Sequence, residues 1–148
     1  MELYMNGNIC FFIGHRNTPW EIFPSLCGAV EKCITEFVVT EFIVGHYGDF
    51  DSMAARAVAD AKKKHHVKLT LLLPYHPADR YPAVNENYDG TFYPPDMEKV
   101  PRKAAIVRAN RYAVDMSEYI ICYVKHPGNS RKLIEYALGK NKHIIEIK

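Results

Sequence analysis

The sequence lacks the patterns that mark several common classes of protein. It has only four cysteines, Cys10, Cys27, Cys33 and Cys122, and no CxxC pair, so neither a zinc site nor a disulfide framework is indicated. No apolar run approaches the roughly 18 residues that a membrane span requires. The amino-terminal residues show no basic region followed by a signal-like core. We therefore expect a soluble, cytoplasmic protein with no membrane partner.

An excess of charge of one sign is also missing. The 19 lysines and arginines nearly balance the 17 acidic residues, which leaves a formal net charge of +2. The cationic run at residues 62–66 falls where a helix carboxyl end favours positive charge. Because nucleic-acid-binding domains usually carry a strong basic patch, we expect no nucleic-acid partner.

Apolar runs alternate with amphipathic segments through the first half of the chain. Residues 8–13 form a continuous apolar run, which is typical of a strand buried on both faces. In residues 25–36, apolar side chains recur at helical spacing. The same alternation predicts strands at 37–44 and 67–73, and a second helix at 52–64 that is rich in small side chains.

The stretch 74–100 differs in composition from the rest of the chain. It holds five prolines and several aromatic side chains, with almost no aliphatic ones. A disordered linker is usually poor in aromatic residues, and long loops inside compact domains tend to be functional. We predict a long ordered loop that acts as a lid, with disorder as the alternative.

After this loop the alternation of helices and strands returns. Pro101 suits the first turn of a helix that continues over 104–115. A strand is predicted at 119–124, a helix at 131–138 and a last strand at 143–147.

These elements indicate a Rossmann-like, doubly wound α/β fold. We predict one domain over residues 1–148, with a five-stranded parallel sheet and helices on both faces. Ligands bind such sheets at the carboxyl ends of the strands, and three glycine-containing turns each follow a predicted strand directly. The candidate ligand-binding residues in these turns are Gly14, His15, Arg16, Gly45, His46, Gly48, Asp49, Asp51, Gly128, Asn129 and Ser130.

The turn at 45–51 has two interpretations. Gly45 and Gly48 let backbone N–H groups approach a ligand, and the helix amino terminus behind them favours a phosphate. Alternatively, the glycines only permit a tight turn and Asp51 is an ordinary N-cap. The turn matches neither the dinucleotide-binding GxGxxG motif nor the P-loop GxxxxGK[ST] motif.

Several basic side chains have both a functional and a structural interpretation. Arg16 suits a phosphate or carboxylate contact, with a structural ion pair as the alternative. His15 is either a ligand contact or a helix cap. Arg108 is a candidate phosphate contact, whereas Arg111 lies four residues before Asp115, the spacing of an intrahelical ion pair.

The acidic candidates are fewer. Glu98 stands just before a helix start, where it is either the candidate catalytic acid or a surface acid that the helix dipole favours. Asp49 and Asp51 are candidates for a ribose contact. They supply fewer oxygen ligands than a magnesium site usually gathers, so we assign no metal and no cofactor.

A series of motifs runs nearly end to end along the chain. They are Phe11-Phe12-Ile13-Gly14-His15-Arg16, Val44-Gly45-His46-Tyr47-Gly48-Asp49-Phe50-Asp51, Leu73-Pro74-Tyr75, Tyr93-Pro94 with Glu98 and Pro101-Arg102, Arg108-Ala109-Asn110-Arg111-Tyr112-Ala113-Val114-Asp115, and Tyr123-Val124 with Gly128-Asn129-Ser130. In this order they resemble the SLOG superfamily of Rossmann-like domains, which includes the LOG phosphoribohydrolases and a bacterial and phage branch with a Gly-His-Arg motif. The resemblance implies a nucleotide or nucleotide-derived ligand whose phosphate lies on the glycine turns. It also implies a homodimer, as is common in this superfamily.

The chain departs from the LOG enzymes at one motif. Their PGGxGTxxE motif carries a glutamate that takes part in cleaving an N-glycosidic bond, whereas Leu133 stands at that position here. Glu135, two residues further on, projects from another part of the helix. Asn129 replaces the second glycine, yet asparagine tolerates left-handed backbone conformations and Ser130 still offers a hydroxyl and an N–H.

Three functional hypotheses follow from these residues. The first is a domain that binds a nucleotide or nucleotide-derived molecule as a sensor, scavenger or regulator. The alternative is an N-glycosidic hydrolase or transferase acting on a nucleoside monophosphate or an ADP-ribose-like substrate, with Glu98 or Asp51 as acid or base. The third is a protein-interaction module that has lost the ligand.

Overall fold

Six short segments, most of them buried, pair in parallel to form one sheet in the computed structural model, which describes residues 8–79 and 85–148. The strand order is β4-β3-β2-β1-β5-β6. The strands are β1 (Asn8–Ile13), β2 (Val39–Val44), β3 (Lys68–Leu72), β4 (Gly90–Phe92), β5 (Tyr119–Cys122) and β6 (His143–Glu146). The predicted α/β Rossmann-like fold is therefore confirmed, with six strands rather than five.

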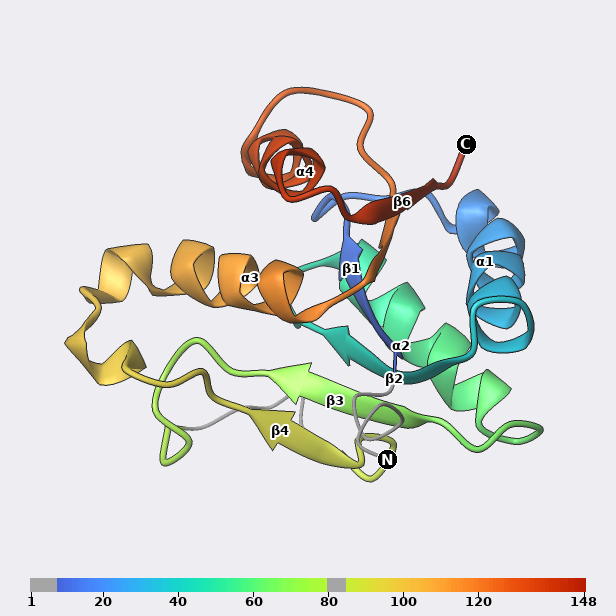
Figure 1. Cartoon of the computed structure of the whole chain (residues 1–148), viewed down its shortest axis with the longest axis horizontal. Coiled ribbons are helices and arrows are strands. Elements are labelled where there is room, and N and C mark those ends of the chain that lie inside the picture. The colour runs from blue at the N-terminus through green and yellow to red at the C-terminus, as the bar shows by residue number, and fades with distance from the viewer. Residues whose placement is uncertain (1–7, 80–84) are drawn as a thin grey trace.

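Helices cover both faces of the sheet because successive strand residues point to opposite sides. Phe12 and Phe42 pack in the cluster that contains α1 (Phe23–Thr35) and α2 (Asp49–Ala61). The neighbouring residues in these strands pack with α3 (Ala105–Met116) and α4 (Asn129–Gly139). Figure 1 shows the two helix pairs on either side of the strands. Three short 3₁₀ helices complete the described chain: η2 (Trp20–Ile22), η3 (Met97–Lys99) and η4 (Arg102–Ala104).

The order of the strands reverses between β1 and β5. The chain leaves β1 through α1 toward β2, whereas it leaves β5 through α4 toward β6 on the other side. The two connections therefore diverge and open a crevice at the carboxyl ends of these neighbouring strands, where doubly wound folds bind ligands.

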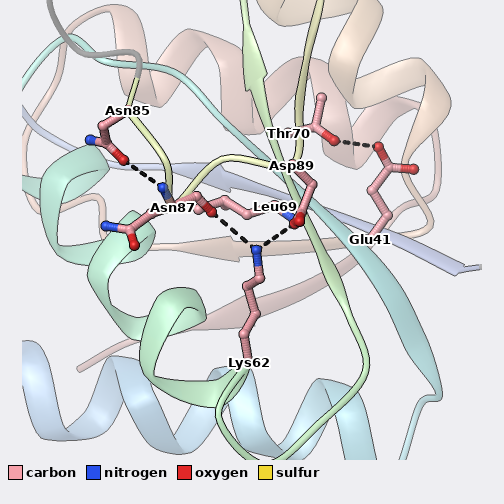
Figure 2. A network of polar contacts seen from close by, with 7 residues as sticks. All are labelled: Glu41, Lys62, Leu69, Thr70, Asn85, Asn87 and Asp89. Carbon is pink, nitrogen blue, oxygen red and sulfur yellow. Dashed lines mark hydrogen bonds and ion pairs between the residues drawn. The ribbon is translucent and has the colours of Figure 1, made fainter.

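The strand that the sequence prediction missed is β4, which lies in the stretch predicted as a loop. It has only three residues, Gly90–Phe92, and shows no apolar run. A polar network fixes its start (Figure 2): the Leu69 amide donates to the Asp89 carboxylate at 2.8 Å, and Lys62 Nζ lies 2.6 Å from the same oxygen. Lys62 also donates to the Asn87 carbonyl at 3.1 Å, and Thr70 donates to Glu41 nearby. Long-range polar contacts thus specify this strand.

Three helices begin earlier in the chain than predicted, and α1 does so by two residues, at Phe23. Helix α2 begins at Asp49 with Gly48 as its N-cap, so Asp51 lies inside the first turn and the N-cap interpretation of Asp51 is wrong. Helix α4 begins at Asn129 with Gly128 as its N-cap. In the described parts of the chain, no helix has the length and apolar character needed to cross a membrane.

Candidate functional site

A pocket of about 270 Å³ opens at the carboxyl ends of β1 and β2, beside the point where the strand order reverses. Its walls come from the ends of these strands, the turn before α2, and helices α3 and α4. The structure brings eight predicted residues together in this pocket: Gly14, His15, Arg16, Gly45, Gly48, Asp51, Asn129 and Ser130. Segments more than 100 residues apart in sequence therefore meet at one edge of the sheet.

Five other candidates lie outside the lining of this pocket. Asp49 accepts a hydrogen bond from the Thr18 amide at 3.3 Å, and His46 packs on Tyr47 with ring centroids 4.3 Å apart. Gly128 is the N-cap of α4. The remaining two are Arg108, which is exposed on α3, and Glu98, which lines a separate pocket.

The turn between β2 and α2 is closed by backbone from the end of β1. The amide of Asp49 donates to the Arg16 carbonyl at 2.7 Å, and that of Phe50 donates to the His15 carbonyl at 3.4 Å. A Cβ at Gly48 would collide with the backbone of Arg16. Two amides at the start of α2 are therefore engaged inside the protein and are not offered to a phosphate.

The turn between β5 and α4 has the opposite arrangement. Gly128 has φ of 143°, a conformation that favours glycine. Outside the helix itself, no residue within 8–79 or 85–148 accepts a hydrogen bond from the amides of Asn129, Ser130 or Arg131. The Ser130 hydroxyl donates to the Gly14 carbonyl at 2.5 Å and fixes the turn against β1. An open helix amino terminus beside a pocket is suited to an anion.

His15 connects the ends of β1 and β5. Its Nε2 accepts a hydrogen bond from the Lys125 amide at 2.8 Å, and its ring stacks on His126 with centroids 3.7 Å apart. Burial lowers the pKa of His15, and the charges of His126 and Arg131 add to this effect. The neutral ring is therefore favoured, and the helix-cap interpretation gives way to a bond with the Lys125 amide.

Asp51 is the single acidic side chain among the described residues that line the pocket. Its Oδ2 accepts a hydrogen bond from the Tyr47 amide at 3.0 Å and would lie 3.1 Å from a Cβ at Gly45. Burial raises the pKa of Asp51 to about 6, although the Tyr47 hydrogen bond acts in the opposite direction. Such a group accepts hydrogen bonds from hydroxyls when ionised and donates a proton when neutral.

The pocket also contains residues that were not chosen from the sequence. Asn110 and Ile106 come from α3, and Leu133 comes from α4. Asn110 adjoins the buried stripe of small residues on α3 (Ala105, Ala109 and Ala113). The spacing of these buried residues indicates which side of α3 faces the sheet, and from the sequence this spacing could have pointed to Asn110 rather than Arg108.

The structure also places Leu133 and Arg111, two residues that were discussed from the sequence. Leu133, at the position of the LOG glutamate, forms part of the pocket wall. Arg111 lies over the Tyr136 ring at 5.0 Å, while the Tyr136 hydroxyl donates to Asp115 at 2.8 Å. Within the described residues, no group of three or more His, Cys, Asp or Glu side chains is placed to hold a metal ion.

Comparisons with known proteins show the fold and no closer relationship. No protein-family model matches the sequence, and no curated protein matches it. DNA processing protein A from Helicobacter pylori, described for its single-stranded DNA binding mode, superposes with a TM-score of 0.67 at 15% identity, over 98% of this chain and 67% of that one. The Moco carrier protein of Chlamydomonas rheinhardtii superposes with a TM-score of 0.60 at 11% identity, over 95% of this chain and 75% of that one.

The likeness to DNA processing protein A corrects one expectation. We expected no nucleic-acid partner because the net charge is small, yet a protein with this fold binds single-stranded DNA. Net charge alone is therefore too weak a criterion in this fold. The homodimer stays a prediction. This chain shares the Rossmann-like fold of these two solved structures.

Proposed function

We propose that the pocket between β1, β2 and α4 binds the phosphate of a nucleotide or nucleotide-derived molecule. The observation that carries this proposal is a difference in backbone hydrogen bonding: within the described residues, the first amides of α4 have no acceptor outside their helix, whereas two of the first amides of α2 bond to carbonyls from the end of β1. A helix amino terminus with open amides binds an anion through both hydrogen bonds and the helix dipole.

The other walls of the pocket suit the rest of such a ligand. Arg16 is exposed at the rim and supplies a guanidinium for the phosphate. Asp51, beside Gly45, accepts hydrogen bonds from ribose hydroxyls. Ile106 and Leu133 supply apolar surface on the opposite wall.

We further propose that the site binds without the LOG-type reaction, as a sensor, scavenger or regulator in the Gly-His-Arg branch of the SLOG superfamily. Leu133 has no proton to exchange, and it occupies the wall position at which that reaction requires a carboxylate. The loss of a general acid or base typically lowers a rate by about 10²- to 10⁴-fold.

Calorimetric titration with ribose 5-phosphate and with AMP tests the proposal. We expect Ser130→Ala to weaken both ligands about fivefold, because it removes the hydroxyl hydrogen bond to Gly14 that fixes the turn beside the phosphate. The matched control is Ser52→Ala in the first turns of α2, which should leave both affinities unchanged. Equal affinities in Ser130→Ala and the unmodified protein would contradict the proposed phosphate position.

One observation favours a second function, that of an N-glycosidic hydrolase or transferase. Asp51 lines the pocket, and its pKa of about 6 suits proton transfer near neutral pH. In that case AMP incubated with stoichiometric protein should release adenine, and Asp51→Asn should abolish the release while ligand binding persists. If the unmodified protein releases no adenine, only the binding function remains.

A further inference from the structure

A second pocket, of about 220 Å³, lies at the carboxyl end of β3. It is formed by the aromatic, proline-rich stretch of the sequence together with the residues that lead into α3, which Figure 1 shows between β4 and α3. Tyr75 and Tyr93 supply aromatic walls, Met97 and Ala105 supply buried apolar surface, and Glu98 stands at the rim. Described residues of the stretch that we predicted to be a lid therefore line a pocket, and their role as a lid stays a prediction.

The two tyrosines in this pocket have different neighbours. The guanidinium of Arg102 lies 4.0 Å from the Tyr75 ring centroid and 3.6 Å from the Asp79 carboxylate, so the Tyr75 face is covered. Among the described residues, Tyr93 makes one ring contact, a tilted one with His76 at a centroid distance of 5.9 Å and an interplanar angle of 64°, and no cation lies over its ring. Tyr93 is therefore the wall on which an aromatic ligand can stack.

The polar groups of the pocket favour a ligand that donates hydrogen bonds. Burial raises the pKa of the Tyr93 phenol, and the carboxylates of Glu98 and Asp79 add to this effect, so both acids lie toward Tyr93. Glu98 makes no hydrogen bond or ion pair with any residue in the described parts of the chain. Ionised carboxylates only accept hydrogen bonds.

His76 adds a ring donor to these acceptors, in a pocket that Arg102 and the hydroxyls of Tyr75 and Tyr93 also line. Its Nδ1 accepts a hydrogen bond from the Ala78 amide at 3.0 Å, which assigns the ring proton of the neutral form to Nε2. The pocket thus offers carboxylate acceptors for an amine and a donor for a ring nitrogen. Adenine and cytosine present this pattern, whereas hypoxanthine and uracil carry a carbonyl in place of the amine.

The two pockets border the same end of helix α3. Ala105 lines the second pocket and Ile106 lines the first, so both cavities border the first turn of α3. The anion site of α4 is fixed to the end of β1 by the Ser130 bond to Gly14. Two strand spacings, about 10 Å, separate β1 from β3. That span is comparable to the length of a nucleoside monophosphate.

We propose that this second pocket binds a nucleobase that carries an exocyclic amine, stacked on Tyr93 and paired with Glu98. The inference rests on the proposed function, because the phosphate of the same ligand occupies the α4 terminus and its ribose lies beside Asp51. The amine and the carboxylate determine which nucleotides the protein accepts.

Calorimetric titration with ribose 5-phosphate, AMP and IMP tests this inference. AMP and IMP differ at C6, where one carries an amine and the other a carbonyl. We expect AMP to bind about tenfold more tightly than IMP, as a hydrogen bond to a charged acceptor allows. In Glu98→Gln the preference should vanish, because the amide serves as donor or acceptor, and ribose 5-phosphate should bind as before.

The control is Glu135→Gln, the same change at an exposed acid on α4, which should keep the preference for AMP. Tyr93→Ala should weaken AMP and leave ribose 5-phosphate unaffected. Equal affinities for AMP, IMP and ribose 5-phosphate in the unmodified protein would overturn the base pocket while the phosphate site stands. If none of the three ligands binds, both the base pocket and the proposed function fail.

Discussion

The turns before α2 and α4 look alike in sequence and differ in what they offer a ligand. Each follows a buried strand and ends in a glycine N-cap, Gly48 or Gly128, without a side-chain cap. Helix α2 carries Asp49 and Asp51 in its first turn, and two of its amides bond to carbonyls from the end of β1. Helix α4 has no acid in its first turn.

The difference teaches that a glycine turn becomes an anion site only when the fold leaves it open. In α2 the dipole is already balanced by two acids, and the glycine makes room for another segment of backbone. In α4 the glycine is required by its own positive φ, and the helix dipole remains available to an external charge. Each prediction below changes one side of this contrast.

The largest effect is expected where the backbone of β1 closes on α2. Gly48→Ala places a Cβ against Arg16 and should lower the free energy of unfolding by about 3 kcal/mol. Gly128→Ala meets no neighbouring atom and should cost only about 1 kcal/mol, from its positive φ. Urea denaturation measures both. Equal losses in the free energy of unfolding would contradict the proposed difference between Gly48 and Gly128.

The next effect concerns the acid of α2. The folded state raises the pKa of Asp51 from 3.8 to about 6, so it holds more protons than the unfolded chain between these values. Ionisation of Asp51 therefore lowers stability as pH rises from about 4 to 6. Asp51→Asn should raise the free energy of unfolding by about 2 kcal/mol at pH 7.5, with no gain at pH 3.5. A gain that is independent of pH would show that ionisation is not the cause.

A third change gives α4 the acid that it lacks. Asn129→Asp preserves side-chain shape, and an acid in the first turn is favourable to the helix. The added charge beside the phosphate should weaken ribose 5-phosphate at least about tenfold, as measured by calorimetry at constant salt. Asp49→Asn on α2 is the control and should leave the affinity unchanged. Undiminished binding in Asn129→Asp would place the phosphate elsewhere.

The smallest effect concerns the connection between the two strand ends. The pKa of His15 is lowered by burial, so the unfolded chain takes up a proton at a higher pH than the folded one. Stability should therefore fall as pH drops below about 6.5. In His15→Gln an amide oxygen can accept from Lys125 without titrating, and this decline should become shallower in thermal unfolding between pH 6.5 and 5.

The sequence predicted the elements whose signals are local. We recognised β1 and β3 from their apolar runs, because a strand buried on both faces is apolar throughout. We recognised α2 because its buried small residues recur at helical spacing. Strand β4 was missed because its three residues are placed by Lys62 and Asp89, which lie 27 positions apart. The meeting of the glycine turns at one edge of the sheet could be predicted because each turn directly follows a strand and parallel strands end at the same edge.

The details of the site depended on distant contacts. Nothing in the local pattern of Gly48 reveals that the carbonyls of His15 and Arg16 engage the amides of α2. Arg108 was singled out for its charge, whereas the helical phase of α3 places Asn110 in the lining of the first pocket. Glu98 lines the second pocket and not the first, because the path of the whole loop sets its distance from the glycine turns.

The polar network of Figure 2 gives the edge of the sheet a cooperativity of its own. One Asp89 oxygen holds both Lys62 and the Leu69 amide, and although partial burial acts in the opposite direction, these bonds lower the pKa of Asp89. Protonation of Asp89 below about pH 4 weakens both bonds together. We expect residues 85–92 then to open as a single unit by partial unfolding while the centre of the sheet stays folded. Acid should therefore loosen this edge of the sheet before its centre.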